Sequence, residues 1–389
     1  MQRPCLPIWK ELNRRKAMRI LALLATDRFS GPGRQILQTA GLLKEHDVEL
    51  VLGCTLMAGM AYPDFFYEAD KRGVPLRILK QERPIDIHLA HQVRHIVRRE
   101  KIDILQTHGY KPSAIAFSLK PVSKLPWLAF MHGHTAEDKK VGIYHKMDRL
   151  FVHFADKIVT VSDEMRYRLA DEFPALRRKL VTVHNAVDPI DFAPKTDTSV
   201  VRASLGLTER DRIIGVIGRF SLEKGHRFFL SAFKSIHRGS HNVKAVLIGE
   251  GPEEASLREY CDVNRLTDHV LFAGYQRDIA SFYRLFDLIV LPSLSEGLPN
   301  VVLEAFLHRI PVAAANVGGV PELVSDGHTG YLFPPADPGG MAKAITAALE
   351  AGGAREYIVD NASKLVETAF FPQAKVNRLL QIYAELLER

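Results

Sequence analysis

Two glutamates, Glu296 and Glu304, closely follow a short apolar run at 288–291. Between them, Gly297 lets a ligand approach the backbone, and Pro299 suits the first turn of a helix. A helix that begins near 299 presents unpaired N–H groups and a partial positive charge, which together attract an anion. Either glutamate alone would more often be a solvated surface residue. Held at different heights in one pocket, the two carboxylates suit hydroxyl groups on two parts of a polyol.

A pair of cations follows another apolar run, at 213–217. Arg219 comes directly after Gly218, and Lys224 precedes Gly225 in the same loop. Arginine offers a planar fork and lysine a point charge, and the two together can neutralise a diphosphate. Because both cations lie on the predicted ligand edge, opposite the start of a helix, we interpret them as a diphosphate site rather than as solvated surface.

Two glycines in the first half, Gly31 and Gly33, lie between the apolar run 18–25 and a segment with helical periodicity. Such a loop before a helix can cradle a phosphate. The loop lacks the spacing GxGxxG and the acidic partner of a ribose, so the pattern disfavours a nicotinamide site.

Three histidines follow apolar runs in the same half: His108, His132 and His134. Two of them are separated by a single glycine, but no carboxylate lies at a compatible spacing, so no metal site is predicted. We expect His132 to face the cleft and to hydrogen-bond a hydroxyl or a phosphate. His108 and His134 are candidates for the side of the cleft that takes the acceptor.

The elements that must position these residues are short apolar runs that alternate with helical stretches. This rhythm is typical of parallel sheets with crossover helices, which bind ligands at the carboxyl ends of their strands. The predicted strands are 18–25, 48–52, 76–79, 103–106, 127–131, 157–161, 180–183, 213–217, 244–248, 269–273, 288–291, 311–315 and 330–333.

The rhythm stops near 185–200, where Pro, Asp and Thr without helical periodicity predict a linker. The sequence therefore predicts an α/β protein with two doubly wound, Rossmann-like domains that face each other across a cleft. We place an extension at 1–17, the acceptor-side domain at 18–190 and the donor-binding domain at 191–370. A last helix, within 371–389, is expected to pack back on the first domain.

Composition restricts the class of protein. Of the 389 residues, 47% are hydrophobic and 25% are charged, which argues against disorder and coiled coil. No apolar stretch approaches the roughly 20 residues that cross a bilayer. The extension lacks the apolar core of a signal peptide, and three scattered cysteines favour a reducing compartment, so we expect a cytoplasmic protein.

Positive charge is concentrated in the first half. Residues 1–195 hold 32 Lys and Arg against 22 Asp and Glu, whereas the remainder holds 20 against 23. A basic surface attracts nucleic acid, anionic lipid or an acidic substrate. The first half lacks a basic patch interleaved with aromatic residues, which argues against nucleic acid. Residues 6–16 are apolar and then basic, so they fit a membrane-surface helix or a plain extension.

Three motifs in the second half resemble those of the retaining glycosyltransferases of family 4, which have the GT-B fold. They are Gly218-Arg219-Phe220 with Lys224-Gly225, Ser295-Glu296-Gly297-Leu298-Pro299-Asn300 with Glu304, and Gly318-Gly319-Val320-Pro321-Glu322. The spacing from Glu296 to Glu304 is that of the Glu-x7-Glu motif of the family. Asn185-Ala186-Val187-Asp188 resembles a further family motif, with Ala in place of the usual Gly.

The resemblance implies a role for each matching residue. Arg219 and Lys224 would bind the donor diphosphate, Glu304 the ribose and Glu296 the donor sugar, with His132 touching that sugar from the acceptor side. We assign catalytic roles to Glu296, His132, Arg219 and Lys224. The implied donor-binding set is Gly31, Gly33, Gly218, Arg219, Lys224, Gly274, Tyr275, Glu296, Gly297, Leu298, Pro299, Asn300 and Glu304. The loop Gly31-Pro32-Gly33 departs from the Gly-Gly version common in the family.

The predicted function is transfer of a sugar from a nucleotide-diphosphate sugar to a hydroxyl of a saccharide or lipid-linked acceptor, in cell-surface polysaccharide or lipopolysaccharide synthesis. Cations and a helix start can stabilise the leaving group, so neither a metal nor another cofactor is expected. Retention would follow a front-face route. The alternatives are a sugar-nucleotide epimerase or hydrolase on the same fold and a non-catalytic nucleotide-sugar-binding protein. An anionic membrane surface is a further expected partner of the basic domain.

Overall fold

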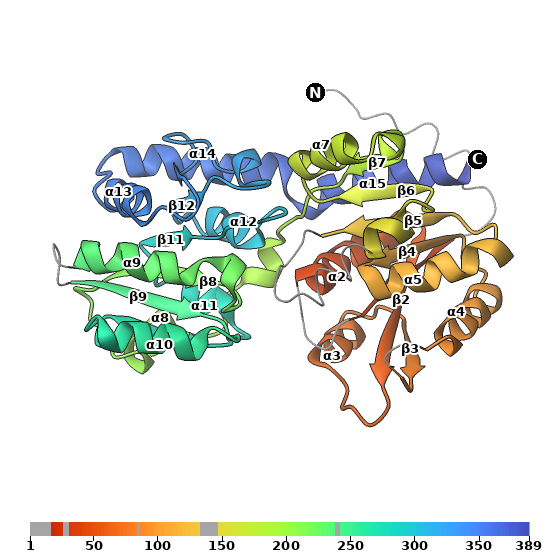
Figure 1. Ribbon diagram of the computed structural model, residues 1–389, viewed down its shortest axis with the longest axis horizontal. Coiled ribbons are helices and arrows are strands. Elements are labelled where there is room, and N and C mark those ends of the chain that lie inside the picture. The colour runs from red at the N-terminus through yellow and green to blue at the C-terminus, as the bar shows by residue number, and fades with distance from the viewer. Residues whose placement is uncertain (1–16, 26–30, 84–85, 133–146, 238–241, 389) are drawn as a thin grey trace.

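The computed structural model describes residues 17–25, 31–83, 86–132, 147–237 and 242–388. They form two α/β domains side by side, each built on one parallel sheet (Figure 1). The strand orders are β3-β2-β1-β4-β5-β6-β7 and β10-β9-β8-β11-β12-β13. In each sheet the chain starts inside, runs to one edge and returns to fill the other, which is the doubly wound arrangement. The predicted fold class is confirmed.

The first sheet contains seven strands: β1 (Met18–Leu24), β2 (Val48–Met57), β3 (Leu76–Gln81), β4 (Ile104–His108), β5 (Trp127–Met131), β6 (Lys157–Thr160) and β7 (Leu180–Thr182). Its helices include α2 (Gly31–Lys44), α3 (Asp64–Lys71), α4 (His88–Arg99), α5 (Tyr110–Leu119) and α7 (Asp163–Glu172). Leu and Ile side chains on both faces of the strands are buried, as in a parallel sheet that helices cover on two sides.

The second sheet contains β8 (Arg212–Ile217), β9 (Val243–Ile248), β10 (Val270–Gly274), β11 (Leu288–Leu291), β12 (Val312–Ala315) and β13 (Tyr331–Phe333). Its helices include α8 (Thr198–Ser204), α9 (His226–His237), α10 (Glu254–Val263), α11 (Ile279–Tyr283), α12 (Asn300–Leu307), α13 (Pro338–Leu349) and α14 (Ala354–Ala369). Every predicted strand of both sheets forms, and β2 continues to Met57, beyond its predicted end.

The predicted linker near 185–200 does connect the two sheets, but it is not irregular throughout. Pro189–Phe192 form a short 3-10 helix, and α8 begins at Thr198. The Asp188 and Asp197 carboxylates accept hydrogen bonds from the backbone of Ile190 and Ser199. The aspartates that look like loop residues in the sequence are therefore helix caps.

The C-terminal helix α15 (Pro372–Leu387) packs on the first domain, although it follows the second domain in the chain. Its apolar stripe of Val376, Leu379, Ile382 and Leu386 is buried in the same core as Ile20 of β1. Both domains are therefore joined twice, through the 183–197 segment and through α15.

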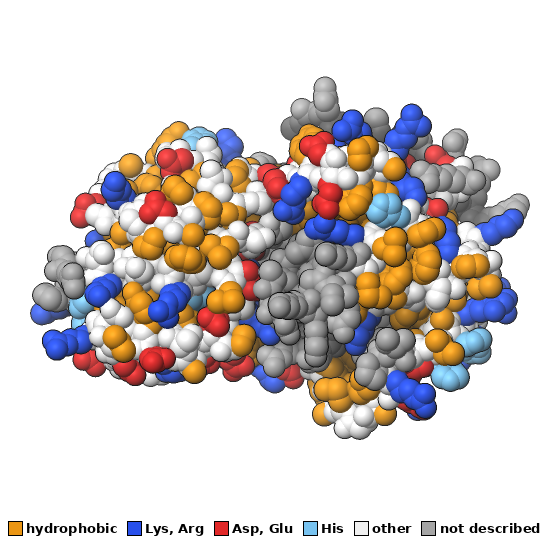
Figure 2. Space-filling model, in the orientation of Figure 1, with side chains coloured by type: hydrophobic (Ala, Val, Ile, Leu, Met, Phe, Trp, Pro, Cys, Tyr) orange, Lys and Arg blue, Asp and Glu red, His pale blue; other side chains and the backbone are white. Residues whose placement is uncertain are grey.

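Hydrophobic side chains reach the surface of both domains. On the face in Figure 2 they are visible over each domain, with acidic and basic side chains interspersed among them. Exposed apolar residues of the first domain include Val122, Met147, Leu150 and Phe154.

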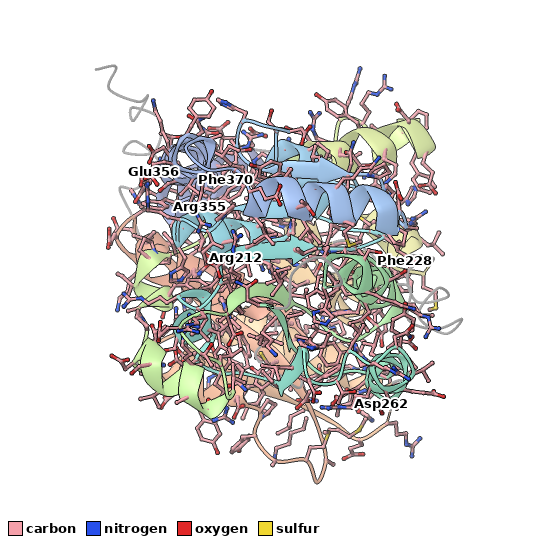
Figure 3. The ribbon with its side chains drawn as sticks, turned by 90° about the vertical axis from the view of Figure 1, so that its left-hand side faces the viewer. Arg212, Phe228, Asp262, Arg355, Glu356 and Phe370 are labelled. Atoms are coloured by element: carbon pink, nitrogen blue, oxygen red, sulfur yellow. The ribbon has the colours of Figure 1, made fainter. Side chains whose placement is uncertain are left out.

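Arginines hold the amino end of the second sheet (Figure 3). Arg212 of β8 donates to the carbonyl of Leu349 at the end of α13, and Arg355 of α14 donates to the carbonyl of Asp287, 3.2 Å away and directly before β11. These contacts occupy the sheet end opposite the predicted ligand edge, so they serve the fold rather than the site.

Candidate active site

A cavity of about 410 Å³ lies between the domains, at the carboxyl ends of their strands. Among the described residues that line it, the first domain supplies Gly31, Pro32, Gln35, His132 and Asn185. The second supplies Ile217, Gly218, Glu223, Lys224, Leu291, Ser295, Glu296, Gly297, Leu298, Pro299, Asn300 and Val301. We call it the interdomain cavity. Residues from both predicted halves of the site thus share one space.

Lys224 and Glu296 form an ion pair in this cavity. The Lys224 ammonium lies 2.7 Å from Glu296 Oε1, which also accepts a hydrogen bond from Ser293 Oγ at 2.6 Å. Gly225 makes the approach possible, because it adopts φ +67° and an added Cβ would collide with the Pro292 carbonyl. The loop after β8 therefore packs directly on the end of β11, which places the cation over the carboxylate.

The loop that carries Glu296 is held between two backbone surfaces. A Cβ on Gly297 would lie 2.9 Å from the carbonyl oxygen of His132, in the other domain. On the opposite side, the Gly319 N–H donates to the Gly297 carbonyl at 3.0 Å, and a Cβ on Gly318 would collide with the Glu296 carbonyl. The Gly318-Gly319 motif thus packs against the Glu296 loop.

Helix α12 begins at Asn300, so Pro299 lies at the cap position and not within the first turn. No side chain caps this helix, and its first residues line the interdomain cavity. Asn300 and Val301, at its amino end, line the same cavity as Lys224, so the positive end of the helix dipole adjoins that cavity. Asn185 of the first domain donates to the Leu298 carbonyl at 3.0 Å and so ties the domains at this point.

Glu304 does not share the cavity with Glu296, in contrast to the single pocket expected. It is only 6% exposed, and its carboxylate accepts from the Tyr283 hydroxyl at 2.8 Å and from Arg34 Nη1 at 3.0 Å. Burial and this carboxylate raise the pKa of Tyr283 well above its ordinary value. The sequence did not single out Arg34 or Tyr283, because neither belongs to the motifs that carry the resemblance.

A second cavity, of about 590 Å³, begins beside Arg34 and lies between α3 and the loop after β10. Tyr275 lines it and is about half exposed, whereas Gly274 supplies a turn with φ +65°. Arg277 of this loop forms an ion pair with Asp64 of α3 at 2.6 Å. Tyr275 is thus separated from Glu296, with the Arg34–Glu304 pair adjoining its cavity.

Arg219 is the cation that the structure does not bring into the interdomain cavity. Its neighbour Gly218 lines the cavity, but Arg219 is exposed and absent from the described lining residues. The sequence placed the two cations together because they share one loop. In the structure, the 3-10 turn Leu222–Lys224 directs only Lys224 towards Glu296.

The two predicted glycines of the first domain have different surroundings. Gly31 lines the cavity, and a Cβ there would lie 3.1 Å from Asn300 Nδ2. Gly33 lies inside α2, where a Cβ would approach the Phe65 ring to 2.8 Å. Gly33 therefore serves the packing of α2 on α3, and the residues that precede Gly31, 26–30, lie outside the described structure.

His132 and His108 form a stacked, hydrogen-bonded pair, of which only His108 is fully buried. His132 lines the cavity, and its Nε2 lies 2.8 Å from Nδ1 of His108. His108 is 4% exposed and lies behind His132, so the expected direct role on the acceptor side does not fit its position. Burial, followed by the charge of Lys375, lowers the pKa of His132 to about 3. His134 lies outside the described residues.

The first domain also contributes polar residues that no sequence pattern indicated. Gln35 of α2 donates to the Ala186 carbonyl at 2.7 Å and accepts from the Ala186 N–H at 2.8 Å. Lys375 of α15 donates to Gln35 Oε1 at 2.7 Å, and burial lowers the pKa of this lysine to about 7. Their partners are far apart in the chain, so only the folded structure reveals the group.

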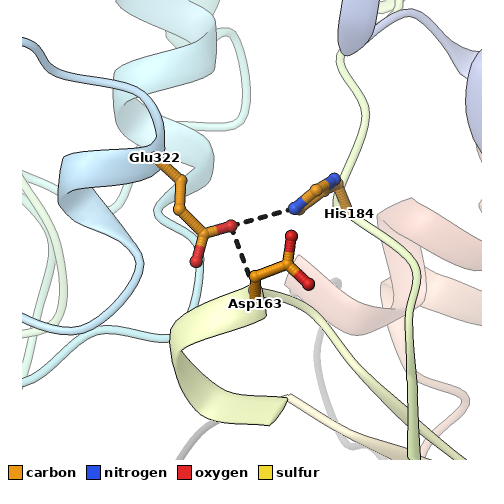
Figure 4. A group of neighbouring side chains, drawn as sticks. All are labelled: Asp163, His184 and Glu322. Carbon is orange, nitrogen blue, oxygen red and sulfur yellow. Dashed lines mark hydrogen bonds and ion pairs between the residues drawn. The ribbon is translucent and has the colours of Figure 1, made fainter. Parts of the chain in front are cut away.

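Glu322 makes a polar contact between the domains (Figure 4). Its carboxylate accepts from the backbone N–H groups of Asp163 and Glu164, at 3.0 and 2.8 Å, in the first turn of α7, and His184 Nε2 lies 2.9 Å away. Burial raises the pKa of Glu322, but these hydrogen bonds outweigh it and hold that pKa below its usual value. The contact ties the Gly318-Gly319 loop to the first domain.

By type and spacing, Asp163, His184 and Glu322 could also ligate a metal, because their ligand atoms lie within 4.8 Å of one another. Both Glu322 oxygens already accept hydrogen bonds, and Asp163 Oδ1 accepts from Arg166 and Thr182. A cation already in contact with Asp163 opposes a second one. We therefore interpret the group as an interdomain contact.

Two family models match the chain. Residues 29–190 match the model described as Glycosyltransferase Family 4, and residues 197–365 match that described as Glycosyl transferases group 1. The chain is 26% identical over 350 residues to the N-acetyl-alpha-D-glucosaminyl L-malate synthase of Bacillus anthracis, covering 88% of this chain and 90% of that protein. It is 33% identical over 231 residues to the alpha-D-kanosaminyltransferase of Streptomyces kanamyceticus, 58% of each chain.

Solved structures share the fold. HepE of Anabaena in complex with UDP-glucose has a TM-score of 0.81 at 20% identity, covering 95% of this chain and 100% of that one. WaaG, described as a glycosyltransferase involved in lipopolysaccharide biosynthesis, has a TM-score of 0.71 at 14% identity, with 94% and 99% covered. The chain belongs to the family 4, group 1 glycosyltransferases and has the GT-B fold. Within the described residues, no helix is both long and apolar enough to span a bilayer.

Proposed function

We propose that this glycosyltransferase moves a sugar, with retention, from a nucleotide-diphosphate sugar to a hydroxyl group of a saccharide or lipid-linked acceptor. The observation that carries the proposal is the Lys224–Glu296 pair at the uncapped start of α12, in a cavity that His132 closes from the other domain. A structural neighbour has been solved with UDP-glucose, which supports a nucleotide sugar as the donor.

In this proposal the second domain stabilises the leaving group. As the bond between the anomeric carbon and the phosphate oxygen breaks, negative charge grows on the diphosphate. Lys224 and the N–H groups of α12 are already oriented towards that charge, which is the arrangement that lowers a barrier most effectively. The proposed chemistry needs no metal, and Arg219, which is exposed in the same loop as Lys224, would add a second cation to the diphosphate.

Retention would follow a front-face route. The acceptor oxygen bonds to the anomeric carbon on the face that the diphosphate leaves, and the acceptor proton passes to the departing phosphate oxygen. Glu296 holds hydroxyl groups of the donor sugar and is not a nucleophile. Its carboxylate is engaged by Lys224 and Ser293, so it is held in one position. Glu304 takes the ribose once the donor displaces Arg34 from it.

The acceptor would approach across the basic first domain, and we propose an anionic membrane surface as its setting. Met147, Leu150 and Phe154 are exposed over the helical stretch 147–152 and the turn that follows it, and the Phe154 ring packs against Phe117. Arg94, Arg98 and Lys120 line a groove beside the exposed Val122. Apolar side chains flanked by cations suit anionic lipid, in a cytoplasmic enzyme of cell-surface polysaccharide synthesis.

The donor is tested first. A thermal-shift panel of UDP, GDP and ADP sugars should raise the melting temperature for one nucleotide class. Lys224→Ala, Arg219→Ala and Glu304→Ala should each weaken that shift, whereas Glu296→Ala should lower turnover more than donor affinity. Unchanged donor affinity in the folded Lys224, Arg219 and Glu304 variants would overturn the assignment of the donor site.

Two rival functions give different results. An epimerase or hydrolase would convert the donor with no acceptor present, and a non-catalytic binder would leave the donor intact with every acceptor. A transferase consumes the donor at a substantial rate only when an acceptor is added.

A separate experiment tests the proposed membrane surface. Sedimentation of the protein with anionic vesicles should be stronger at low salt than at high salt, because an electrostatic attachment weakens with salt.

A further inference from the structure

A continuous line of hydrogen bonds runs from the C-terminal helix to the interdomain cavity. The Tyr383 hydroxyl of α15 lies 2.8 Å from Gln106 Oε1 of β4, and Gln106 Nε2 lies 2.7 Å from His108 Nε2. His108 Nδ1 lies 2.8 Å from His132 Nε2, and His132 lines the cavity. Tyr383, Gln106 and His108 are all at most 4% exposed. The line thus connects a helix remote from the site to a residue of the site.

The buried tyrosine sets the direction of this line. Within the described residues, Gln106 Oε1 is the only acceptor in reach of the Tyr383 hydroxyl hydrogen. Reversing the amide would leave that hydrogen without an acceptor, and a buried donor without a partner is strongly disfavoured. With Oε1 towards Tyr383, the amide nitrogen donates to His108 Nε2, which must then be unprotonated.

Each later bond follows from the one before it. A neutral imidazole carries one N–H, so His108 is protonated on Nδ1 and donates to His132 Nε2. His132 Nε2 is then an acceptor, and the remaining proton of this ring lies on Nδ1. Within the described residues, the bond to His108 is the only hydrogen bond of the His132 ring.

Both rings remain neutral for a physical reason. The His108 ring stacks on Phe130, 4.5 Å between centroids, in a buried site where a charged imidazolium would lose its hydration. Burial is the main cause that lowers the pKa of His108 well below its ordinary value, and any charge on His132 or on the nearby Lys375 acts in the same direction. Both rings are therefore neutral, and the direction of the hydrogen bonds decides which ring nitrogen holds the proton.

We propose that Tyr383 is a positioning residue that, through Gln106 and His108, fixes His132 as the Nδ1–H tautomer and thereby presents a hydrogen-bond donor to the cavity. The group that it would meet is an acceptor oxygen of the nucleotide sugar, either a sugar hydroxyl or a phosphate oxygen. That last step rests on the proposed function. The tautomer itself does not, since it is a property of the unliganded protein.

The tautomer can be measured directly. In the ¹⁵N-histidine-labelled full chain at pH 7.5, the couplings between ring nitrogens and ring carbon protons distinguish Nδ1–H from Nε2–H. His132→Asn identifies the signals of His132 by their loss. We expect Nδ1–H for both His132 and His108 in the wild type. An Nε2–H tautomer or an imidazolium at either ring would overturn the proposal.

A single deletion tests the role of the tyrosine. Tyr383→Phe removes the hydroxyl and keeps the ring in the core. We expect mixed tautomers at His132 and a fall in kcat of about fivefold with little change in the donor KM, the effect of one hydrogen bond. Tyr331→Phe, which removes a hydroxyl from the second domain, should change neither. A wild-type tautomer pattern in folded Tyr383→Phe contradicts the proposal.

The two hypotheses fail in different ways. If no nucleotide sugar binds but His132 carries its proton on Nδ1, the proposed function is wrong and the line of hydrogen bonds stands. If the donor is turned over but His132 is an Nε2–H tautomer, the proposed function stands and the proposed role of Tyr383 is wrong.

Discussion

The two domains build their sides of the cavity in opposite ways. On the second domain, Lys224 and Glu296 come from loops that end neighbouring strands, and glycines pack those loops against each other. On the first domain, His132 is supported by His108, Gln106 and a tyrosine of α15, which is the last helix of the chain. One side is assembled from local motifs and the other from distant segments.

The chemistry of the two sides differs as well. The second domain presents charges that are already paired, as in Lys224 with Glu296. The first domain presents neutral groups around one buried lysine, Lys375, whose pKa burial lowers to about 7. In the proposed function, the cation that would meet the diphosphate lies in the half with 20 basic against 23 acidic residues, so the basic composition of the first half does not mark the proposed donor site.

The largest expected effect is on the charged side. Lys224→Ala should lower kcat/KM by about 100-fold or more, the usual result of removing one preorganised donor to a developing anion. Steady-state rates with the donor identified by thermal shift measure it. Lys244→Ala is the matched control, since this lysine of β9 donates to the Asp268 carbonyl at the opposite end of the same sheet. Equal losses in both variants would contradict a specific role for Lys224.

A buried histidine of the second domain should make the fold sensitive to acid. Burial, and then the Lys224 charge, lowers the pKa of His226 to about 3, and neither of its ring nitrogens has a partner in the described chain. The unfolded chain binds a proton below about pH 6.5 and the folded one does not, so stability falls as the pH falls. Between pH 7 and 5 the loss is about 2 kcal/mol.

Urea unfolding at the two pH values checks this, with His226→Phe as the comparison. The variant keeps a ring against Phe220, 5.0 Å away between centroids in the wild type. It should lose less stability than the wild type on acidification. The same slope in both proteins would show that His226 does not carry the effect.

Lys375 allows the matching test on the first domain, at alkaline rather than acidic pH. Its folded pKa of about 7 lies below the unfolded value near 10.4, so the unfolded chain holds more protons in between and stability rises with pH. From pH 7 to 8.5 the gain is about 1.5 kcal/mol. Lys375→Met should flatten this rise in urea unfolding. An unaltered rise would mean that this ammonium is solvated.

This contrast also explains what the sequence could predict. The sequence could predict the strands and the positions of Glu296 and Lys224, because these depend on neighbours in the chain or on the common edge of a sheet. It could not predict that Glu304 lies apart from Glu296. The Glu304 carboxylate is held by Arg34 and Tyr283, whose side chains come from other elements. Nor does adjacency in sequence fix the direction of a side chain: Lys224 lines the cavity whereas Arg219 of the same loop is exposed, and His108 lies buried behind His132.

The smallest expected effect concerns Glu304, whose carboxylate accepts hydrogen bonds from both domains. Glu304 accepts from Tyr283 of its own domain and from Arg34 of the other. Tyr283→Phe removes the hydrogen bond from within the domain, and the ion pair remains. The donor KM should rise about fivefold, near 1 kcal/mol, with kcat unchanged, because in the proposed function Glu304 would bind the ribose equally before and during the reaction. Tyr357→Phe, on the exposed face of α14, is the control. A fall in kcat with constant KM would place Glu304 in the reaction step rather than in ribose binding, and the division between the two sides of the cavity would have to be redrawn.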